Sequence, residues 1–149
     1  MQKIIFIVYI FFLLPYSTTM ANEEASYDVV HKTDIYEVRY YSDRLVVQVT
    51  NKGDNNSFRK LFNYISGENK NSEKIAMTIP VTQTKKDGEL FMQFYLPSKF
   101  NKETTPIPTN PDLEITTIPE GYFAVIKFSG RSSDKNFEKH NKILKQKLL

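Results

Sequence analysis

The sequence has no cysteine and no tryptophan, and only two of its 149 residues are histidine. Without cysteine the chain forms no disulfide and offers no thiolate to a metal. Two isolated histidines do not by themselves make a metal site. A cysteine nucleophile, a glycine-rich phosphate loop and an HExxH motif are all missing, and the carboxylates are scattered. The sequence therefore indicates that the protein is not an enzyme.

Charge is also modest, at a formal net value of +3. The basic residues are spread along the chain, which argues against nucleic acid as a partner. Charged residues make up 25% of the sequence and hydrophobic residues 40%, as in an ordinary globular protein. The length is sufficient for one domain.

One long apolar run stands at the N-terminus. Lys3 precedes the run Ile4–Pro15, and small or polar residues follow as far as Ala21. This pattern predicts a signal peptide over residues 1–21 and a mature domain over 22–149, exported to the periplasm or the extracellular space. At roughly a dozen residues the run is short for a bilayer, so no membrane span is expected after cleavage. An uncleaved anchor and a buried helix are the alternatives.

Four segments after residue 34 alternate apolar and polar residues with the period of a β-strand. They are Ile35–Tyr41, Leu45–Thr50, Lys74–Gln83 and Leu90–Leu96. Pro80 predicts an edge or a bulge in the third segment. Lys86-Asp87-Gly88 predicts the turn that leads into the fourth. Residues 22–34 are expected to be a polar lead-in, and the proline-rich residues 97–111 an extended connector.

A helix is predicted between the second and third strands. Phe58, Leu61, Phe62 and Ile65 follow a helical spacing, Ser57 is the expected N-cap, and Gly67 the expected C-terminal glycine.

The strand pattern then repeats. Tyr36-Glu37-Val38 matches Leu113-Glu114-Ile115, and a second helix is expected from near Ser132, over Asp134–Leu149. The repeat predicts two strand–strand–helix–strand–strand halves, the second lacking its last two strands. Chance similarity is the alternative explanation.

Several motifs, in order, resemble the SOUL haem-binding family. They are Tyr36-Glu37-Val38-Arg39-Tyr40-Tyr41, Tyr64-Ile65-Ser66-Gly67-Glu68-Asn69, Lys74-Ile75-Ala76-Met77-Thr78-Ile79-Pro80-Val81-Thr82, Phe94-Tyr95-Leu96-Pro97 and Phe128-Ser129-Gly130. The resemblance implies an α+β fold, a distorted antiparallel β-barrel built from two pseudo-symmetric halves with two helices. It also implies that the chain is a C-terminally truncated member, with an open sheet edge through which it self-associates.

The resemblance implies further that the first helix lines a groove for non-covalent haem. Phe58 and Phe62 would contact the tetrapyrrole, and Arg59 and Lys60 would lie near its propionates. The alternative for the two phenylalanines is ordinary core packing.

Two other residues are candidates for contact with haem. Tyr40 occupies a position at which some SOUL relatives carry a histidine proposed to ligate iron, and tyrosinate is a known axial ligand. His140 shares a predicted helix face with Phe137 and Leu144. Packing is the alternative for both residues.

Three functions compete at this point. The first is binding of haem or a related tetrapyrrole outside the cytoplasm. The second is a general binding module for apolar or planar small molecules, and the third is an interaction protein without a ligand. No metal site is expected apart from haem.

Overall fold

The computed structural model describes residues 22–50, 56–131 and 133–149, so the predicted signal peptide of residues 1–21 lies outside the described residues. In these ranges four strands precede a helix and five more strands precede a second one, and the two main sheets are antiparallel, which confirms the α+β class. The elements are β1 (Glu23–Glu24), β2 (Asp28–Lys32), β3 (Glu37–Tyr41), β4 (Arg44–Thr50), α1 (Asn56–Ile65), β5 (Thr78–Ile79), β6 (Val81–Lys86), β7 (Glu89–Tyr95), β8 (Leu113–Ile118), β9 (Gly121–Val125) and α2 (Asp134–Leu148).

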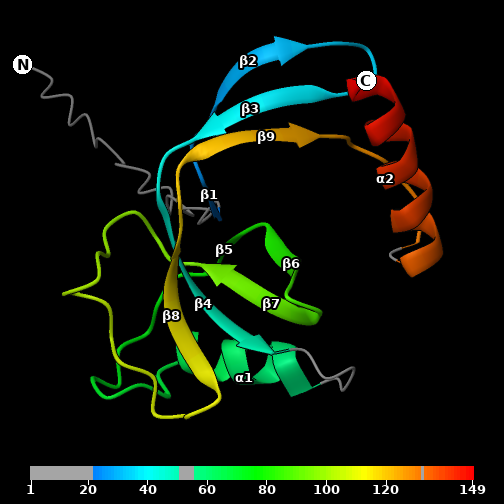
Figure 1. Ribbon diagram of the computed structural model, residues 1–149. Coiled ribbons are helices and arrows are strands. Elements are labelled where there is room, and N and C mark those ends of the chain that lie inside the picture. The colour runs from blue at the N-terminus through cyan, green and yellow to red at the C-terminus, as the bar shows by residue number, and fades with distance from the viewer. Residues whose placement is uncertain (1–21, 51–55, 132) are drawn as a thin grey trace, which may run out of the picture.

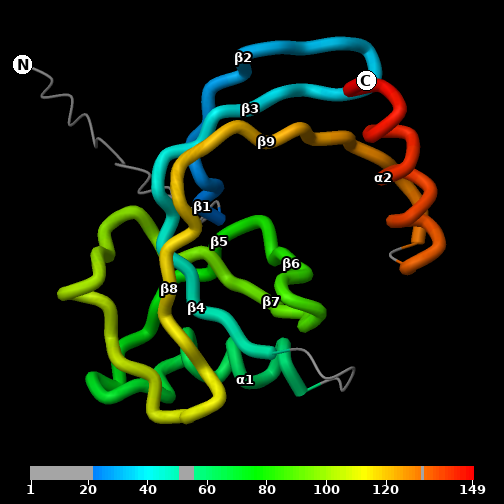
Figure 2. The backbone as a smooth tube through the Cα atoms, in the orientation of Figure 1, coloured from blue at the N-terminus to red at the C-terminus, as the bar shows by residue number. Residues whose placement is uncertain are grey.

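Two antiparallel sheets form most of the fold (Figure 1). One has the order β2-β3-β9 and the other the order β6-β7-β4-β8, while β1 and β5 form a small parallel pair. The consecutive strands β3 and β4 pass from the first sheet to the second, and β8 and β9 return beside them (Figure 2). The described strands form separate sheets and no closed barrel, so the pseudo-symmetric barrel that the resemblance implies is not confirmed for this part of the chain.

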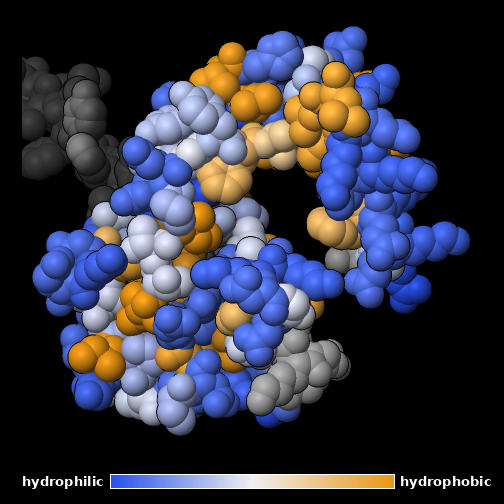
Figure 3. Space-filling model, viewed as in Figure 1, coloured by the Kyte–Doolittle hydropathy of each residue, from blue (hydrophilic) through white to orange (hydrophobic). Residues whose placement is uncertain are grey.

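The space-filling view shows how the two sheets relate. The molecule is hollowed between the part made by the three-stranded sheet with α2 and the part made by the four-stranded sheet (Figure 3). Helix α1 lies against the four-stranded sheet, far from α2 (Figure 1). The observed order of elements, β3-β4-α1-β6-β7 and then β8-β9-α2, follows the predicted order.

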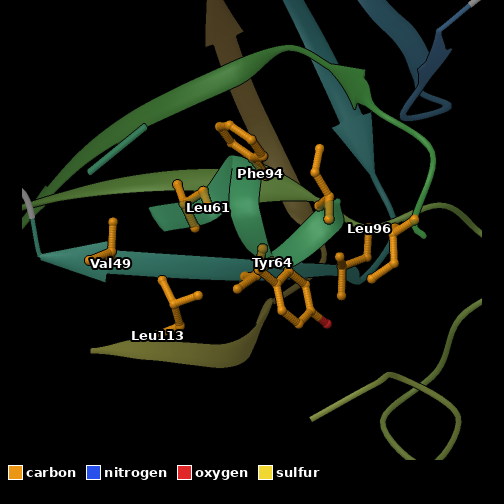
Figure 4. Close-up of a cluster of buried hydrophobic side chains, with 9 residues drawn as sticks. Val49, Leu61, Tyr64, Phe94, Leu96 and Leu113 are labelled. Atoms are coloured by element: carbon orange, nitrogen blue, oxygen red, sulfur yellow. The ribbon is translucent and has the colours of Figure 1, made fainter. Parts of the chain in front are cut away.

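The core lies between α1 and the four-stranded sheet. Leu61 and Tyr64 of α1 are fully buried against Val47 and Val49 of β4 and Phe94 of β7 (Figure 4). Leu96 and Leu113 belong to the same cluster. Burial of a large apolar side chain stabilises a fold by about 1.5–3 kcal/mol, so this single layer supplies much of the stability.

Several local features match the sequence. Gly67 follows α1 with a φ of 117°, and its N–H donates to the carbonyl of Tyr64. Asp87 and Gly88 both have positive φ in the two-residue turn from β6 to β7. Strand β6, which begins after Pro80, is an edge strand as predicted.

Other expectations were wrong. Ser57 is not an N-cap, because α1 already includes Asn56 and the Ser57 side chain is buried inside the first turn. The polar lead-in contains two strands, β1 and β2. All residues of these two strands are exposed. Alternation of apolar and polar residues identifies a strand only where one of its faces is buried, so these two strands carry no such signal.

The two helices differ in how they pack. Four residues of α1 are buried, whereas α2 has none, and its Phe137 is 62% exposed. Ser133 caps α2 by accepting a hydrogen bond from the backbone N–H of Asn136, close to the predicted start. Within the described ranges, neither helix has the length and apolar character needed to cross a bilayer.

The packing of α1 predicts opposite outcomes for two neighbouring substitutions. Leu61→Ala empties space in the core and should lower the free energy of unfolding by about 2–5 kcal/mol. Phe62→Ala removes a ring that is 49% exposed and should cost about 1 kcal/mol or less. Urea unfolding followed by circular dichroism measures both. Equal costs for the two variants would contradict the described orientation of the helix.

Candidate functional site

The solvent-facing edge of α1 carries two phenyl rings. Phe58 and Phe62 are one helical turn apart, so they share a face of the helix. Their rings are stacked, with centroids 6.2 Å apart and planes 12° apart, and they are 45% and 49% exposed. Two nearly parallel rings that remain open to solvent form an apolar surface suited to a planar ligand. This surface is named the phenyl platform.

The platform continues onto the sheet. The ring of Phe58 meets that of Phe94 edge-on at 5.2 Å, which joins the exposed pair to the buried core. Val81 lies directly opposite Phe94 in the register of β6 and β7 and is 39% exposed. Residues paired across two strands point to the same face of a sheet, so Val81 extends the apolar surface toward the edge strand.

Two cations, Arg59 and Lys60, lie on the same helix as the platform, and only one of them is paired with a carboxylate. Arg59 donates from Nη2 to the amide oxygen of Asn56 at 2.6 Å, a partner without charge. Lys60 forms an ion pair with Asp112, with Nζ and Oδ2 2.9 Å apart. The positive charge of Arg59 is therefore the more available of the two to an anionic group.

Tyr40 lies on β3 in the three-stranded sheet, away from α1. Its hydroxyl donates to Oε2 of Glu120 at 2.6 Å, and its ring packs against Tyr122 with centroids 5.2 Å apart. The hydrogen bond to a carboxylate favours the neutral phenol and raises the pKa of Tyr40 above its usual value. A tyrosinate ligand requires the opposite shift.

His140 lies on α2, and its ring stacks on Phe128 with centroids 4.1 Å apart. Its Nδ1 is 2.7 Å from the carbonyl oxygen of Asn136, one turn earlier. A neutral histidine in this position donates from Nδ1 and leaves Nε2 as an acceptor.

The structure brings together four of the six residues that the sequence singled out. Phe58, Arg59, Lys60 and Phe62 share α1, whereas Tyr40 and His140 lie on other elements. Sequence reasoning missed Val81 and Asp112, which join the site through strand register and an ion pair. In the described parts of the chain, no three His, Asp or Glu side chains gather in an arrangement suited to a metal ion.

An exposed apolar platform with a nearby cation offers contacts to a flat, anionic small molecule. A model of the SOUL heme-binding protein family matches residues 22–149, which is the whole mature domain predicted from the sequence. The chain therefore belongs to the SOUL haem-binding family, a family of binding proteins. A search of curated proteins finds no match to it.

The contact between Tyr40 and Glu120 predicts a specific pH dependence. Replacing Glu120 by Gln removes the negative charge that opposes ionisation, so the pKa of Tyr40 should fall back toward its ordinary value. Carbon-13 NMR of the labelled tyrosine ring, followed through an alkaline titration, measures this pKa. Tyr122, whose ring packs against Tyr40 at an interplanar angle of 54°, is the internal reference. An unchanged pKa for Tyr40 in Glu120→Gln would show that the hydrogen bond does not control it.

Proposed function

We propose that this protein binds haem or a related tetrapyrrole against the phenyl platform of α1. The observation that carries the proposal is the stacked, half-exposed pair of Phe58 and Phe62. Exposing two large apolar rings to water costs free energy, and a planar ligand that covers them offsets this cost. Membership of the SOUL haem-binding family supports the same ligand class.

The surroundings of the platform fit the chemistry of a tetrapyrrole. Phe58, Phe62 and Val81 offer contact to the flat apolar ring, and Arg59 offers a charge-assisted hydrogen bond to a propionate. Lys60 contributes less because Asp112 already neutralises it. Haem supplies a planar metalloporphyrin, and the residues of the platform bind and orient its ring.

The proposed binding relies on the porphyrin ring more than on its iron. Tyr40 and His140, the two residues considered as iron ligands, lie on β3 and α2. Tyr40 is engaged with Glu120 as a neutral phenol, and His140 is stacked on Phe128. Modest, reversible affinity follows, because packing and one charged contact carry it. We propose in addition that the protein acts after export, as its N-terminal sequence suggests.

Substitutions on α1 test the proposal. Phe58→Asp and Phe62→Asp each remove ring contact and place a negative charge beside the propionates. Haemin affinity, measured by titration of the Soret band, should fall roughly tenfold or more in each.

The matched control is Phe137→Asp, which makes the same change at an exposed ring on α2. It should leave the affinity unchanged, and thermal unfolding of all three variants verifies that they remain folded. Unchanged binding in Phe58→Asp and Phe62→Asp, or an equal loss in Phe137→Asp, would place the ligand elsewhere.

A further inference from the structure

The guanidinium of Arg44 lies among three aromatic rings where the two main sheets meet. Its Cζ is 4.1 Å from the ring centroid of Tyr41, 4.6 Å from that of Phe123 and 5.6 Å from that of Tyr95. These rings come from β3, β9 and β7. Aromatic rings stabilise the cation through their faces, but they do not supply the oxygen acceptors that its N–H groups need.

One edge of this guanidinium has no hydrogen-bonding partner. Nε and Nη2 of Arg44 are buried, and neither donates to any acceptor in the described residues. A buried charged donor without an acceptor costs free energy, so a partner at this edge would stabilise the site. Nε and Nη2 lie along the same side of the guanidinium and together bind one carboxylate group.

A second arginine, Arg39, has the same edge of its guanidinium paired with a carboxylate. Arg39 uses its Nε and Nη2, at 2.9 and 2.7 Å, to donate to Oε2 of Glu37. Tyr41 lies between the two arginines, because its hydroxyl is 3.4 Å from Nη1 of Arg39 and its ring faces Arg44. Arg39 therefore has a carboxylate at the edge that Arg44 leaves unpaired.

Arg44 is also among the residues that line a cavity. Its volume is about 700 Å³, within the range typical of small-molecule sites, and its lining includes Arg44 and Tyr95. Leu45, Leu96 and Phe100 give it an apolar part.

Three carboxylates also line the cavity and limit what it accepts. Glu23 and Asp43 already accept hydrogen bonds from the backbone N–H groups of Ser98 and Glu120, and Glu24 is the third. Arg44 and Lys102 are the cations of the lining, so the carboxylates outnumber them and repel a doubly charged anion more strongly than a singly charged one. The site therefore favours a monocarboxylate over a phosphate.

We infer that Arg44 binds the carboxylate of a small monocarboxylic acid whose apolar part occupies this cavity. The site is separate from the phenyl platform, because the lining of the cavity includes no residue of α1 or β6. The inference therefore does not depend on tetrapyrrole binding.

Titration of the whole protein with benzoate, followed on the Nε–H signals of arginine by ¹H–¹⁵N NMR, tests it. The signal of Arg44 should move downfield and saturate, as expected for a new hydrogen bond to a carboxylate. Arg39, which is already paired with Glu37, and Arg131 should stay in place. Benzamide, a neutral analogue of similar shape, should cause no such shift, and phenyl phosphate should bind more weakly.

Two variants complete the experiment. Arg44→Lys keeps the charge but loses the paired N–H edge, so benzoate affinity, followed on backbone amides around the cavity, should fall roughly tenfold or more. Arg131→Lys is the control and should bind as the wild type does. If Arg44→Lys does not fold, through-bond assignment of the Arg44 signal in the wild type still allows the titration to decide.

The inference is overturned by any of three results. The first is the absence of a saturable shift at Arg44. The second is an equal response to benzamide. The third is an Arg44 signal that is already hydrogen-bonded without ligand and loses that bond in Asp43→Asn, because Asp43 would then be the partner.

Discussion

A buried hydrogen-bond system around Tyr64 and Asn69 joins α1 to the connectors beside it, while a shared apolar core joins the helix to the four-stranded sheet. The Tyr64 hydroxyl donates to the carbonyl of Pro106 at 2.7 Å and so ties the helix to the connector between β7 and β8. Asn69 donates to the carbonyls of Tyr64 and Glu73, and its Oδ1 accepts from the backbone N–H groups of Asn71 and Glu73. Burial raises the pKa of Tyr64 to about 12, as expected for a phenol held neutral in the core.

This attachment decides which face of α1 is available to a ligand. With Leu61, Tyr64 and Ile65 held inward, the helical spacing turns Phe58 and Phe62 toward solvent. Helix α2 lacks an equivalent anchor and buries no side chain. The same kind of residue therefore has different surroundings on the two helices. Phe58 and Phe62 stack on each other, whereas Phe137 on α2 is the more exposed ring.

The sequence predicted the elements whose patterns are local. The strand over Leu45–Thr50, the helix after Ser57 and the turn at Lys86-Asp87-Gly88 were predicted from alternation, helical spacing and glycine. The structure contains all three, with the strand and the helix beginning at Arg44 and Asn56. Strands β1 and β2 were missed because they are exposed on both faces and carry no periodic signal. Closure of the barrel depends on long-range pairing, which a local pattern does not specify.

The candidate site was predictable to the same extent. Phe58, Arg59, Lys60 and Phe62 are close in sequence, so one helix is enough to bring them together. The pairing of Lys60 with Asp112 and the position of Val81 depend on contacts between distant segments. The surroundings of the Arg44 guanidinium could not be predicted from the sequence, because the rings around it come from three separate strands.

In the proposed complex, a tetrapyrrole lies on the phenyl platform. NMR mapping with gallium protoporphyrin, a diamagnetic substitute for haem, tests it most directly, because the ring current of the porphyrin shifts nearby protons strongly. We expect the largest shifts at the ring protons of Phe58 and Phe62 and at the Nε–H of Arg59. Largest shifts at Phe128 and His140, or at Tyr40 and Tyr122, with α1 unaffected, would contradict it.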